Sequence, residues 1–101
     1  MKFRLSTAAL EDLDSIHNHT LSTWGEEQAE RYLAMIWSTF ERIANAPRQW
    51  RLRPEIHPDC RICFSGRHAI LFRVAVEKIE IARVLHDAMD FPEHMMDAFS
   101  S

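Results

Sequence analysis

The sequence lacks the features of a membrane or secreted protein. Its 101 residues contain no apolar run that approaches the roughly 20 residues needed to cross a bilayer. The N-terminal stretch MKFRLSTAALEDLDS has no signal-peptide apolar core and becomes acidic at once. Internal repeats and low-complexity segments are missing as well. We therefore expect one soluble, cytoplasmic domain covering residues 1–101, with no membrane contact.

Glycine is also scarce, and its two occurrences, Gly25 and Gly66, are each predicted to separate two elements. Gly25 follows the apolar periodicity of one helix and precedes that of another, so it is a natural helix stop. Gly66 lies in Ser65–Arg67, which is predicted to be a turn leading into a strand. A tight turn is also predicted at Glu77–Lys78, from the polar break alone, because the Gly or Asn that such turns prefer is missing there.

Cysteine is limited to Cys60 and Cys63, in the order Cys-Arg-Ile-Cys. With His57 and His68 they form a spacing of four nitrogen and sulfur ligands that could suit a structural zinc ion. Against this, Cys63 is predicted to open a strand, where alternate residues face opposite ways. A redox motif would need a helix that begins after the first cysteine, and the sequence has no such start. We expect buried or semi-exposed thiols, with no metal and no cofactor.

Charge is unevenly distributed along the chain, although the net charge is only −3. Residues 1–47 carry four Lys/Arg and seven Asp/Glu, whereas residues 48–83 carry eight Lys/Arg and four Asp/Glu. Residues 84–101 carry no Lys/Arg and four Asp/Glu. Ten of the twelve basic residues are arginine, which suits planar contacts with carboxylates and phosphates. The pattern predicts a basic surface from the middle of the chain, or ion pairing between that region and acidic helices.

A strand followed by a helix is predicted at the start of the chain. Polar and apolar residues alternate over Lys2–Ser6, which is typical of a strand. Ser6 or Thr7 is a suitable N-cap for the helix, and Glu11 and Asp12 lie in or near its first turn. The residues that recur at helical spacing through this first helix are Leu10, Leu13, Ile16, His17, Thr20, Leu21 and Trp24.

A second, longer helix is predicted over Glu26–Ala46, ended by the proline that follows. The single glycine between the two helices predicts that they form an antiparallel hairpin. The apolar face of the second helix comprises Ala29, Tyr32, Leu33, Ile36, Trp37, Phe40, Ile43 and Ala44. We expect this face to be core, although Trp24 and Trp37 could anchor a partner if exposed.

The second half of the chain is predicted to form strands. Arg48–Asp59 carries prolines and charges and is expected to be a loop. A short strand at Ile62–Phe64 precedes a β-hairpin with strands His68–Val76 and Ile79–Leu85. The fold class is therefore α+β: an N-terminal strand, a two-helix antiparallel hairpin and a three-stranded antiparallel run that completes a small sheet. The helix pair must bury its apolar face against one antiparallel sheet.

Five short motifs follow one another along nearly the whole chain. They are Ala9-x2-Asp12-Leu13-x2-Ile16, Trp24-Gly25-x2-Gln28-Ala29-x2-Tyr32, Gly66-Arg67-His68, Phe72-Arg73-Val74 and Arg83-Val84-Leu85-His86-x2-Met89-Asp90. Together they resemble the ParE toxins of the RelE/ParE superfamily, and the RVLHxxMD ending is the most specific piece. The resemblance implies a β-α-α-β-β-β toxin of a type II toxin–antitoxin pair, a class associated with plasmid stabilisation.

The resemblance also implies that the protein inhibits DNA gyrase by binding it. A ParD-like antitoxin would neutralise it by lying across the helical hairpin and adding a strand to the sheet. We expect target contacts at Arg83, His86, Met89, Asp90, His94 and Met95. Antitoxin contacts are expected at Leu21, Trp24, Tyr32, Trp37, Trp50, Arg67 and Arg73. For Arg83 and Asp90, an ion pair that fixes the chain end is the structural alternative.

RelE-type relatives instead cut mRNA on the ribosome, and Arg73, Arg83 and His86 could supply part of that chemistry. Such enzymes usually place a tyrosine near the chain end, with several lysines beside it. Here the single tyrosine is Tyr32, lysine occurs only twice, and the residue after His86 is an aspartate that would repel an RNA phosphate. We therefore predict a toxin without enzymatic activity. A ribonuclease, or a non-toxic relic that still binds antitoxin, is the alternative.

Overall fold

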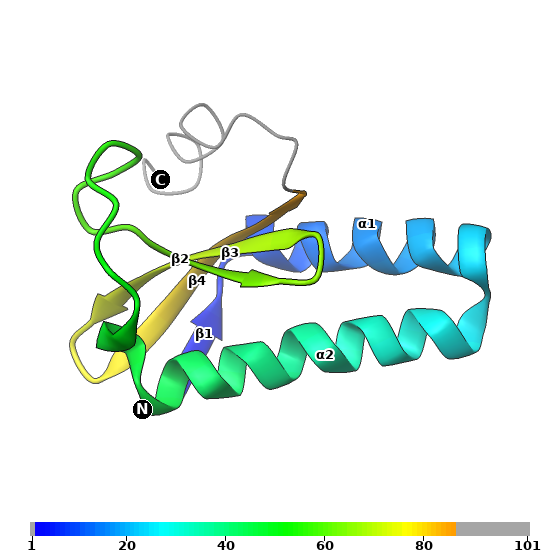
Figure 1. The fold of residues 1–101 in the computed structure, drawn as a ribbon, viewed down its shortest axis with the longest axis horizontal. Helices are drawn as coiled ribbons and strands as arrows, with labels where there is room; N and C mark the ends of the chain where they lie inside the picture. The colour runs from blue at the N-terminus through cyan, green and yellow to red at the C-terminus, as the bar shows by residue number, and fades with distance from the viewer. Residues whose placement is uncertain (1, 87–101) are drawn as a thin grey trace.

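The computed structural model describes residues 2–86, and its elements follow the predicted order (Figure 1). They are β1 (Lys2–Leu5), α1 (Thr7–Trp24), α2 (Glu26–Asn45), the short 3-10 helix η1 (Pro47–Gln49), β2 (Arg61–Ser65), β3 (His68–Ala75) and β4 (Lys78–His86). In this part of the chain no helix combines the length and the apolar character needed to cross a membrane. The predicted target contacts Met89, Asp90, His94 and Met95 lie outside the described residues.

The four strands form one sheet in the order β1-β4-β3-β2. Strands β2, β3 and β4 are antiparallel neighbours, as predicted. Strand β1 pairs with β4 in parallel, from Lys2 opposite Lys78 to Leu5 opposite Ile81, so the sheet is mixed and not antiparallel throughout. The alternation that predicts a strand carries no information on the direction of its neighbour, which is set by hydrogen-bond pattern and connection.

The turn between β3 and β4 lies one residue earlier than predicted. Ala75 pairs with Lys78, so Val76 and Glu77 form the turn and Lys78 belongs to β4. Lys78 enters the sheet because it pairs with Ala75 on one side and with Lys2 on the other. Glu77 has a φ of 62°, a left-handed conformation that glycine or asparagine would adopt at lower cost. The apolar Val76 is left 89% exposed at the tip.

Ser6 ends β1 and begins α1, as its N-cap role predicts. Its hydroxyl accepts a hydrogen bond from the Ala9 amide (3.0 Å) and donates one to the Ala82 carbonyl (2.6 Å). Its own amide donates to the Ile81 carbonyl (3.0 Å). One residue therefore satisfies a free amide at the helix start and fastens that start to β4.

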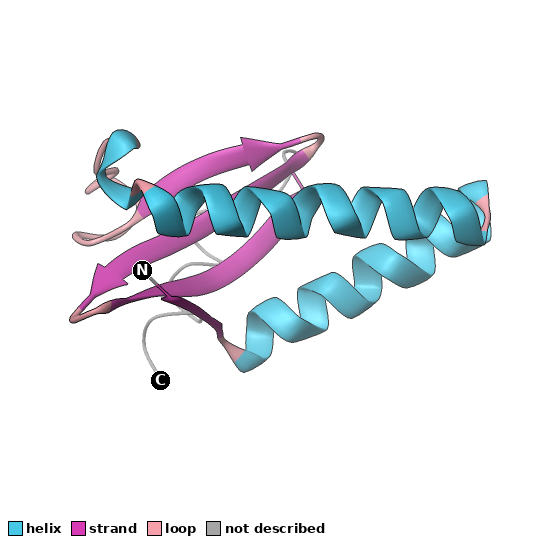
Figure 2. Ribbon diagram, turned by 90° about the horizontal axis from the view of Figure 1, so that it is seen from below, coloured by secondary structure: helices cyan, strands magenta, loops and turns pink. Residues whose placement is uncertain are grey.

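The two helices form the predicted antiparallel hairpin, joined at Gly25, which has a φ of 93°. Both helices cover the same face of the sheet, and the end where they meet extends beyond the strands (Figures 1 and 2). The sheet therefore supports the part of the hairpin away from Gly25, while the end at Gly25 projects past it.

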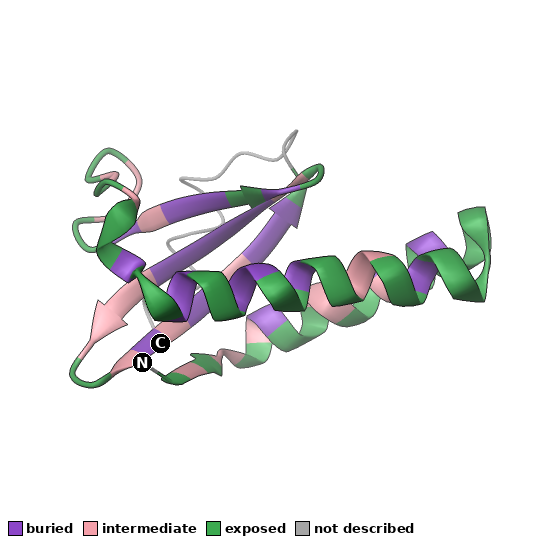
Figure 3. Ribbon diagram, turned by 60° about the horizontal axis from the view of Figure 1, so that its bottom comes forward, coloured by how far each residue is buried: buried purple, intermediate pink, exposed green. Residues whose placement is uncertain are grey.

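The main core lies between the sheet and the helices, where Ile36, Phe40 and Ile43 of α2 are fully buried (Figure 3). Strand β3 contributes Ile70 and Phe72 to this core, while the alternate residues face the other side of the sheet. That second face holds a smaller cluster comprising Cys60, Ile62, Ala69, Leu71 and Leu85, with Ile56 packed against it. The predicted apolar face of α2 is therefore core, except that Trp37 remains 48% exposed.

Replacing Phe40 by alanine should lower the free energy of unfolding by about 3–5 kcal/mol, because a fully buried aromatic side chain is lost and leaves a cavity. Chemical denaturation by urea measures the change. Phe64→Ala on β2 is the matched control, because Phe64 is 56% exposed and should cost well under half as much. Equal losses for the two variants would contradict this arrangement of the core.

Candidate functional site

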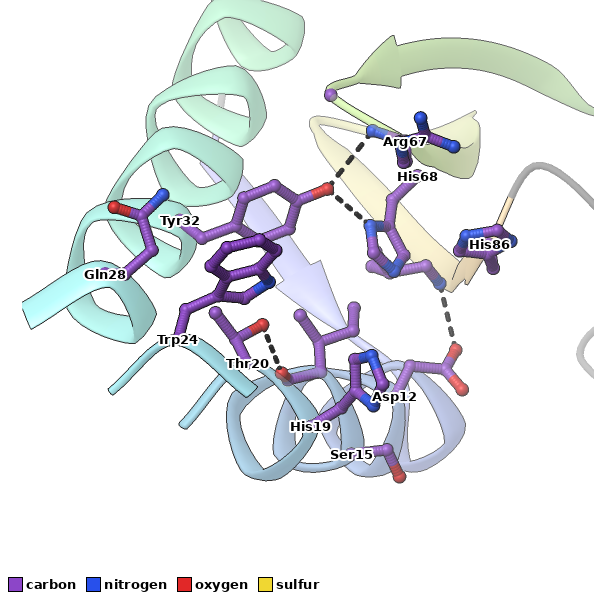
Figure 4. A pocket seen from close by; sticks show the side chains of 13 residues that line it. Asp12, Ser15, His19, Thr20, Trp24, Gln28, Tyr32, Arg67, His68 and His86 are labelled. Atoms are coloured by element: carbon purple, nitrogen blue, oxygen red, sulfur yellow. Dashed lines mark hydrogen bonds between the residues drawn. The ribbon is translucent and has the colours of Figure 1, made fainter. Parts of the chain in front are cut away.

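A pocket of about 580 Å³ opens where the helical hairpin passes the end of the sheet. Its walls come from both helices, from the β2–β3 turn and from the facing ends of β3 and β4 (Figure 4). The side chains that give it chemical character are Trp24, Tyr32, Arg67, His68 and His86. Residues from both halves of the chain therefore share one recess.

Tyr32 joins α2 to the end of the sheet. Its Oη lies 2.6 Å from Nδ1 of His68, and it accepts a hydrogen bond from the Arg67 amide at 3.2 Å. His68 stands opposite His86 in the β3–β4 register, with the two ring centroids 5.5 Å apart. A phenol and two imidazoles from three elements thus lie near one another in the lining of the pocket (Figure 4).

Gly66 allows this close contact between the turn and α2. Its φ is 59°, in the left-handed region that favours glycine. A Cβ at this position would lie 2.8 Å from Oη of Tyr32 and 2.9 Å from Cε of Met35. The turn can therefore approach α2 only because residue 66 has no side chain.

An ion pair joins α1 to β4 beside the pocket, where Asp12 and Val84 line the wall. Arg83 donates from Nε to Oδ2 of Asp12 (2.7 Å) and from Nη2 to Oδ1 (2.8 Å), and the Val84 amide donates to Oδ2 (2.9 Å). Both charged side chains are only 14% exposed. A register shift opposite Leu71 and Phe72 leaves Ala82 without a counterpart on β3, next to this arginine.

The sequence and the fold of this chain are both similar to those of known proteins. A family described as "ParE toxin of type II toxin-antitoxin system, parDE" matches residues 3–91. The chain belongs to the ParE toxin family. The toxin ParE1 of Caulobacter vibrioides is 38% identical over 93 residues, covering 92% of this chain and 96% of that one.

Other relatives agree. The toxin ParE1 of Mycobacterium tuberculosis is 37% identical over 95 residues, covering 93% of this chain and 97% of the relative. A solved structure described as "Chromosomal ParDE TA system from P. aeruginosa" superposes with a TM-score of 0.76 at 25% identity. That match covers 85% of this chain and 95% of the other. The family and the fold predicted from the sequence motifs are therefore confirmed.

The residues predicted to bind the antitoxin do not form one surface. Trp24, which is 71% exposed, lines the pocket with Tyr32 and Arg67. Leu21, 40% exposed, lies one turn before Trp24 on α1. Trp37 lies farther along α2 and packs edge-on against other rings of the core. An antitoxin contact at each of these residues stays a prediction.

Trp50 and Arg73 lie elsewhere. The Trp50 ring packs edge-on against Phe72 at a centroid distance of 6.1 Å. Arg73 pairs with Glu80 across β3 and β4, with Nε 2.6 Å from Oε2. Because Phe72 faces the helices, the next residue, Arg73, faces the opposite side of the sheet.

The residues named for a RelE-type site are likewise separated. Arg73 faces away from the helices, Arg83 is paired with Asp12, and His86 alone lines the pocket. Among the predicted target contacts, Arg83 and His86 fall within the described residues, and their contact with a target stays a prediction. The alternative for Arg83, an ion pair with Asp90 that fixes the chain end, stays a prediction because Asp90 lies outside the described residues. Arg83 instead forms an ion pair with Asp12 on the first helix.

Sequence reasoning named His68 as a possible zinc ligand and as part of the Gly66-Arg67-His68 motif, but it missed the contact with Tyr32. The sequence did contain one signal for the pairing of His68 with His86. In a β-hairpin, residues at equal distances from the turn face each other, which places His68 near the end of the last strand. No local pattern indicated that Tyr32 reaches them. Asp12 was identified as a helix-start acid, and its bond to Arg83, 71 residues away, has no sequence signature.

The two cysteines lie in different environments. Cys60 belongs to the cluster on the outer face of the sheet, whereas Cys63 faces the main core near Arg42. Burial raises the pKa of the Cys60 thiol to about 12 and also raises the pKa of Cys63. Within residues 2–86 no three His, Cys, Asp or Glu side chains gather closely enough to hold a metal ion. The spacing of His57, Cys60, Cys63 and His68 therefore does not assemble a zinc site.

Replacing Asp12 by alanine should lower the free energy of unfolding by about 3 kcal/mol, because Arg83 would keep its charge in a largely buried place without the carboxylate. Glu11→Ala is the control, since Glu11 is exposed on the same helix. Urea denaturation of both variants measures the difference. A loss of less than about 1 kcal/mol for Asp12→Ala would show that this ion pair does not fasten α1 to β4.

The Cys60 thiol of the folded protein should react slowly with iodoacetamide at pH 8. A thiol with a pKa of about 12 is thiolate in about one molecule in ten thousand at that pH. Because the pKa is raised, the rate should still increase with pH above 9, where an ordinary cysteine levels off. Mass spectrometry after timed labelling measures this. The urea-unfolded protein is the control and should be labelled rapidly at both cysteines.

Proposed function

We propose that this ParE-family toxin inhibits DNA gyrase by binding it and that a ParD-like antitoxin neutralises it. The observation that carries the proposal is the family match over residues 3–91, to toxins whose description includes the parDE pair. The similar solved structure is likewise described as a ParDE system. Both support a partner protein for this chain, and the gyrase target follows from the resemblance of its motifs to ParE toxins.

Action by contact is supported by the way the arginines are used. Arg73 and Arg83 each form an ion pair within the fold, at 2.6 Å and 2.7 Å, which leaves neither placed as a cation over a substrate phosphate beside His86. The large exposed apolar side chains instead suit binding to another protein. On the helices these are Leu10, Leu21, Trp24, Met35 and Trp37.

An antitoxin can also use the edges of the sheet. Strands β1 and β2 are the outer strands of the sheet, where a further strand could pair. The outer side of β2 is already bridged at Arg61 by Leu52, so this edge is only partly open. Strand addition supplies main-chain hydrogen bonds, while side-chain recesses supply specificity. The exposed hairpin and the open edges together match a partner that wraps around the toxin.

A ribonuclease is the second candidate, and one observation favours it. The structure gives His86 the companions that the sequence did not reveal, a second imidazole at His68 and the phenol of Tyr32, which is hydrogen-bonded to it. These two imidazoles line the pocket together with Arg67. Two imidazoles near an arginine could move the two protons of RNA transesterification. If this candidate holds, purified protein will cleave mRNA on programmed ribosomes, and His68→Ala and His86→Ala will each abolish cleavage.

Purified toxin should inhibit supercoiling by DNA gyrase and raise the amount of cleaved DNA trapped on the enzyme. Agarose gels of plasmid treated with gyrase and excess toxin measure both effects. A translation reaction that contains the same toxin is the control and should run at its normal rate. If gyrase and translation are both unaffected, the gyrase proposal is contradicted. The alternative that then stands is a non-toxic relic that only binds antitoxin.

A further inference from the structure

We infer that the sheet carries a binding surface for the phosphate backbone of duplex DNA, on the face that points away from the helices and beside the β3–β4 turn. This turn lies at the opposite end of the strands from the pocket (Figure 1). The inference goes beyond the proposed function, because a toxin can inhibit gyrase by binding it without touching DNA. The features that carry it are the strand register, the excess of positive charge and the lack of an apolar anchor.

The register of the strands gathers basic side chains on this face. Ile79 of β4 belongs to the core between sheet and helices, so Lys78 and Glu80 on either side of it face away from the helices. Across the parallel pair, Lys2 lies next to Lys78 and Arg4 next to Glu80. Across the antiparallel pair, Arg73 lies next to Glu80 on its other side. The basic sheet face is the name used below for Lys2, Arg4, Arg73, Lys78 and Glu80.

Most of the positive charge on this face has no counter-charge in the described part of the chain. Glu80 is the one acid of the basic sheet face, and it is already paired with Arg73 at 2.6 Å. Lys2, Arg4 and Lys78 take part in none of the ion pairs of residues 2–86. Lys2 and Lys78 are direct neighbours, and like charges side by side destabilise a sheet. A bound polyanion would remove this repulsion.

The acidic groups of the first half of the chain lie on the other side of the molecule. Residues 1–47 carry seven Asp/Glu, and all seven lie within α1 and α2. Both helices cover the face of the sheet opposite to the basic sheet face (Figure 2). A polyanion is therefore attracted to the local positive potential of the sheet, although the net charge of the chain is −3.

The chemistry of this surface favours nucleic acid over an acidic protein. None of the large exposed apolar side chains of residues 2–86 belongs to the basic sheet face, and Val76 is the one at the neighbouring turn. Protein interfaces take most of their binding energy from buried aromatic and apolar anchors. Contacts with a phosphate backbone depend instead on lysine and arginine and need no apolar recess.

The cations are also arranged in a line. Lys2 and Arg4 point to the same side of β1 and are separated along it by about 6.6 Å, twice the rise of a strand residue. A line of cations can follow one strand of a duplex, and contact with its backbone alone carries no sequence information. Because duplex DNA is the polyanion on which gyrase acts, we take it as the occupant and expect binding that is independent of sequence.

The first test measures binding of the full-length toxin to a short fluorescent DNA duplex by anisotropy, without gyrase and over a range of salt concentrations. Lys2→Gln and Lys78→Gln should each weaken binding about fivefold to tenfold in 0.1 M salt, because each phosphate contact contributes about −0.9 to the slope of log K against log salt. The slope should become less steep by about 1 in each variant. Arg31→Gln, at an exposed position of α2, is the matched control and should bind within twofold of the parent.

A second variant should bind DNA more tightly. Glu77 is exposed at the turn directly before Lys78, where its carboxylate repels a phosphate. Glu77→Lys should therefore strengthen binding by a factor similar to the loss in Lys78→Gln, and its backbone keeps the same left-handed conformation with a side chain. Glu30→Lys makes the same charge change on an exposed site of α2. Equal gains in the two variants would mean that only net charge matters and would overturn the inference.

Other results separate this inference from the proposed function. A parent protein that does not bind the duplex even in 0.05 M salt refutes the DNA surface, while the gyrase proposal is still decided by the supercoiling assay. Tight DNA binding with unimpaired gyrase supports the DNA surface and contradicts the gyrase proposal. Stronger binding to duplex RNA, or displacement of DNA by polyglutamate more readily than by unlabelled DNA, assigns the surface to RNA or to an acidic protein and overturns the inference.

Thermal unfolding of the same variants examines whether the chain itself already covers this surface. Lys2→Gln and Lys78→Gln should melt at no lower temperature than the parent, because each removes the repulsion between two neighbouring lysines. Arg31→Gln is again the control. A drop in melting temperature in both lysine variants, absent from the control, would mean that a carboxylate of this chain pairs with the lysines, and would overturn the inference.

Discussion

The carboxylate of Asp12 holds the helical hairpin on the last strand. It accepts three hydrogen bonds, two from Arg83 and one from the backbone of Val84, at a place where both charged side chains are 14% exposed. A buried pair is more stable when further hydrogen bonds satisfy its charged groups, and the bond from Val84 does so for the carboxylate. Because α1 is one wall of the pocket and β4 another, the same contact fixes the distance between these two walls.

Elements and their order were predictable from the sequence because they depend on local periodicity. The Ser6 cap, the stop at Gly25 and the buried stripe of α2 all follow from residues within a turn or two of one another. The direction of β1 and the place of the β3–β4 turn were not predictable in this way. Both depend on Lys78, which pairs with Ala75 and with Lys2, a residue at the far end of the described chain.

The candidate site was harder to predict than the fold, for the same reason. Trp24, Tyr32, Arg67 and His86 were each named, but as parts of two separate surfaces, and the structure brings them to one pocket. The contacts between these elements depend on how far the hairpin extends past the sheet and on the missing side chain at Gly66. Sequence motifs identify such residues as candidates. Where these residues come together depends on how the helices pack against the sheet.

The parallel pairing of β1 with β4 has a consequence for how the toxin is made. The N-terminal strand and Ser6, the cap of the first helix, form their hydrogen bonds to the sheet with residues 78–82. During synthesis the helical hairpin can form early from local contacts, but its sheet must wait until the last strand has been translated. The nascent chain therefore emerges without its pocket, which can form only after residues 78–82 have been translated.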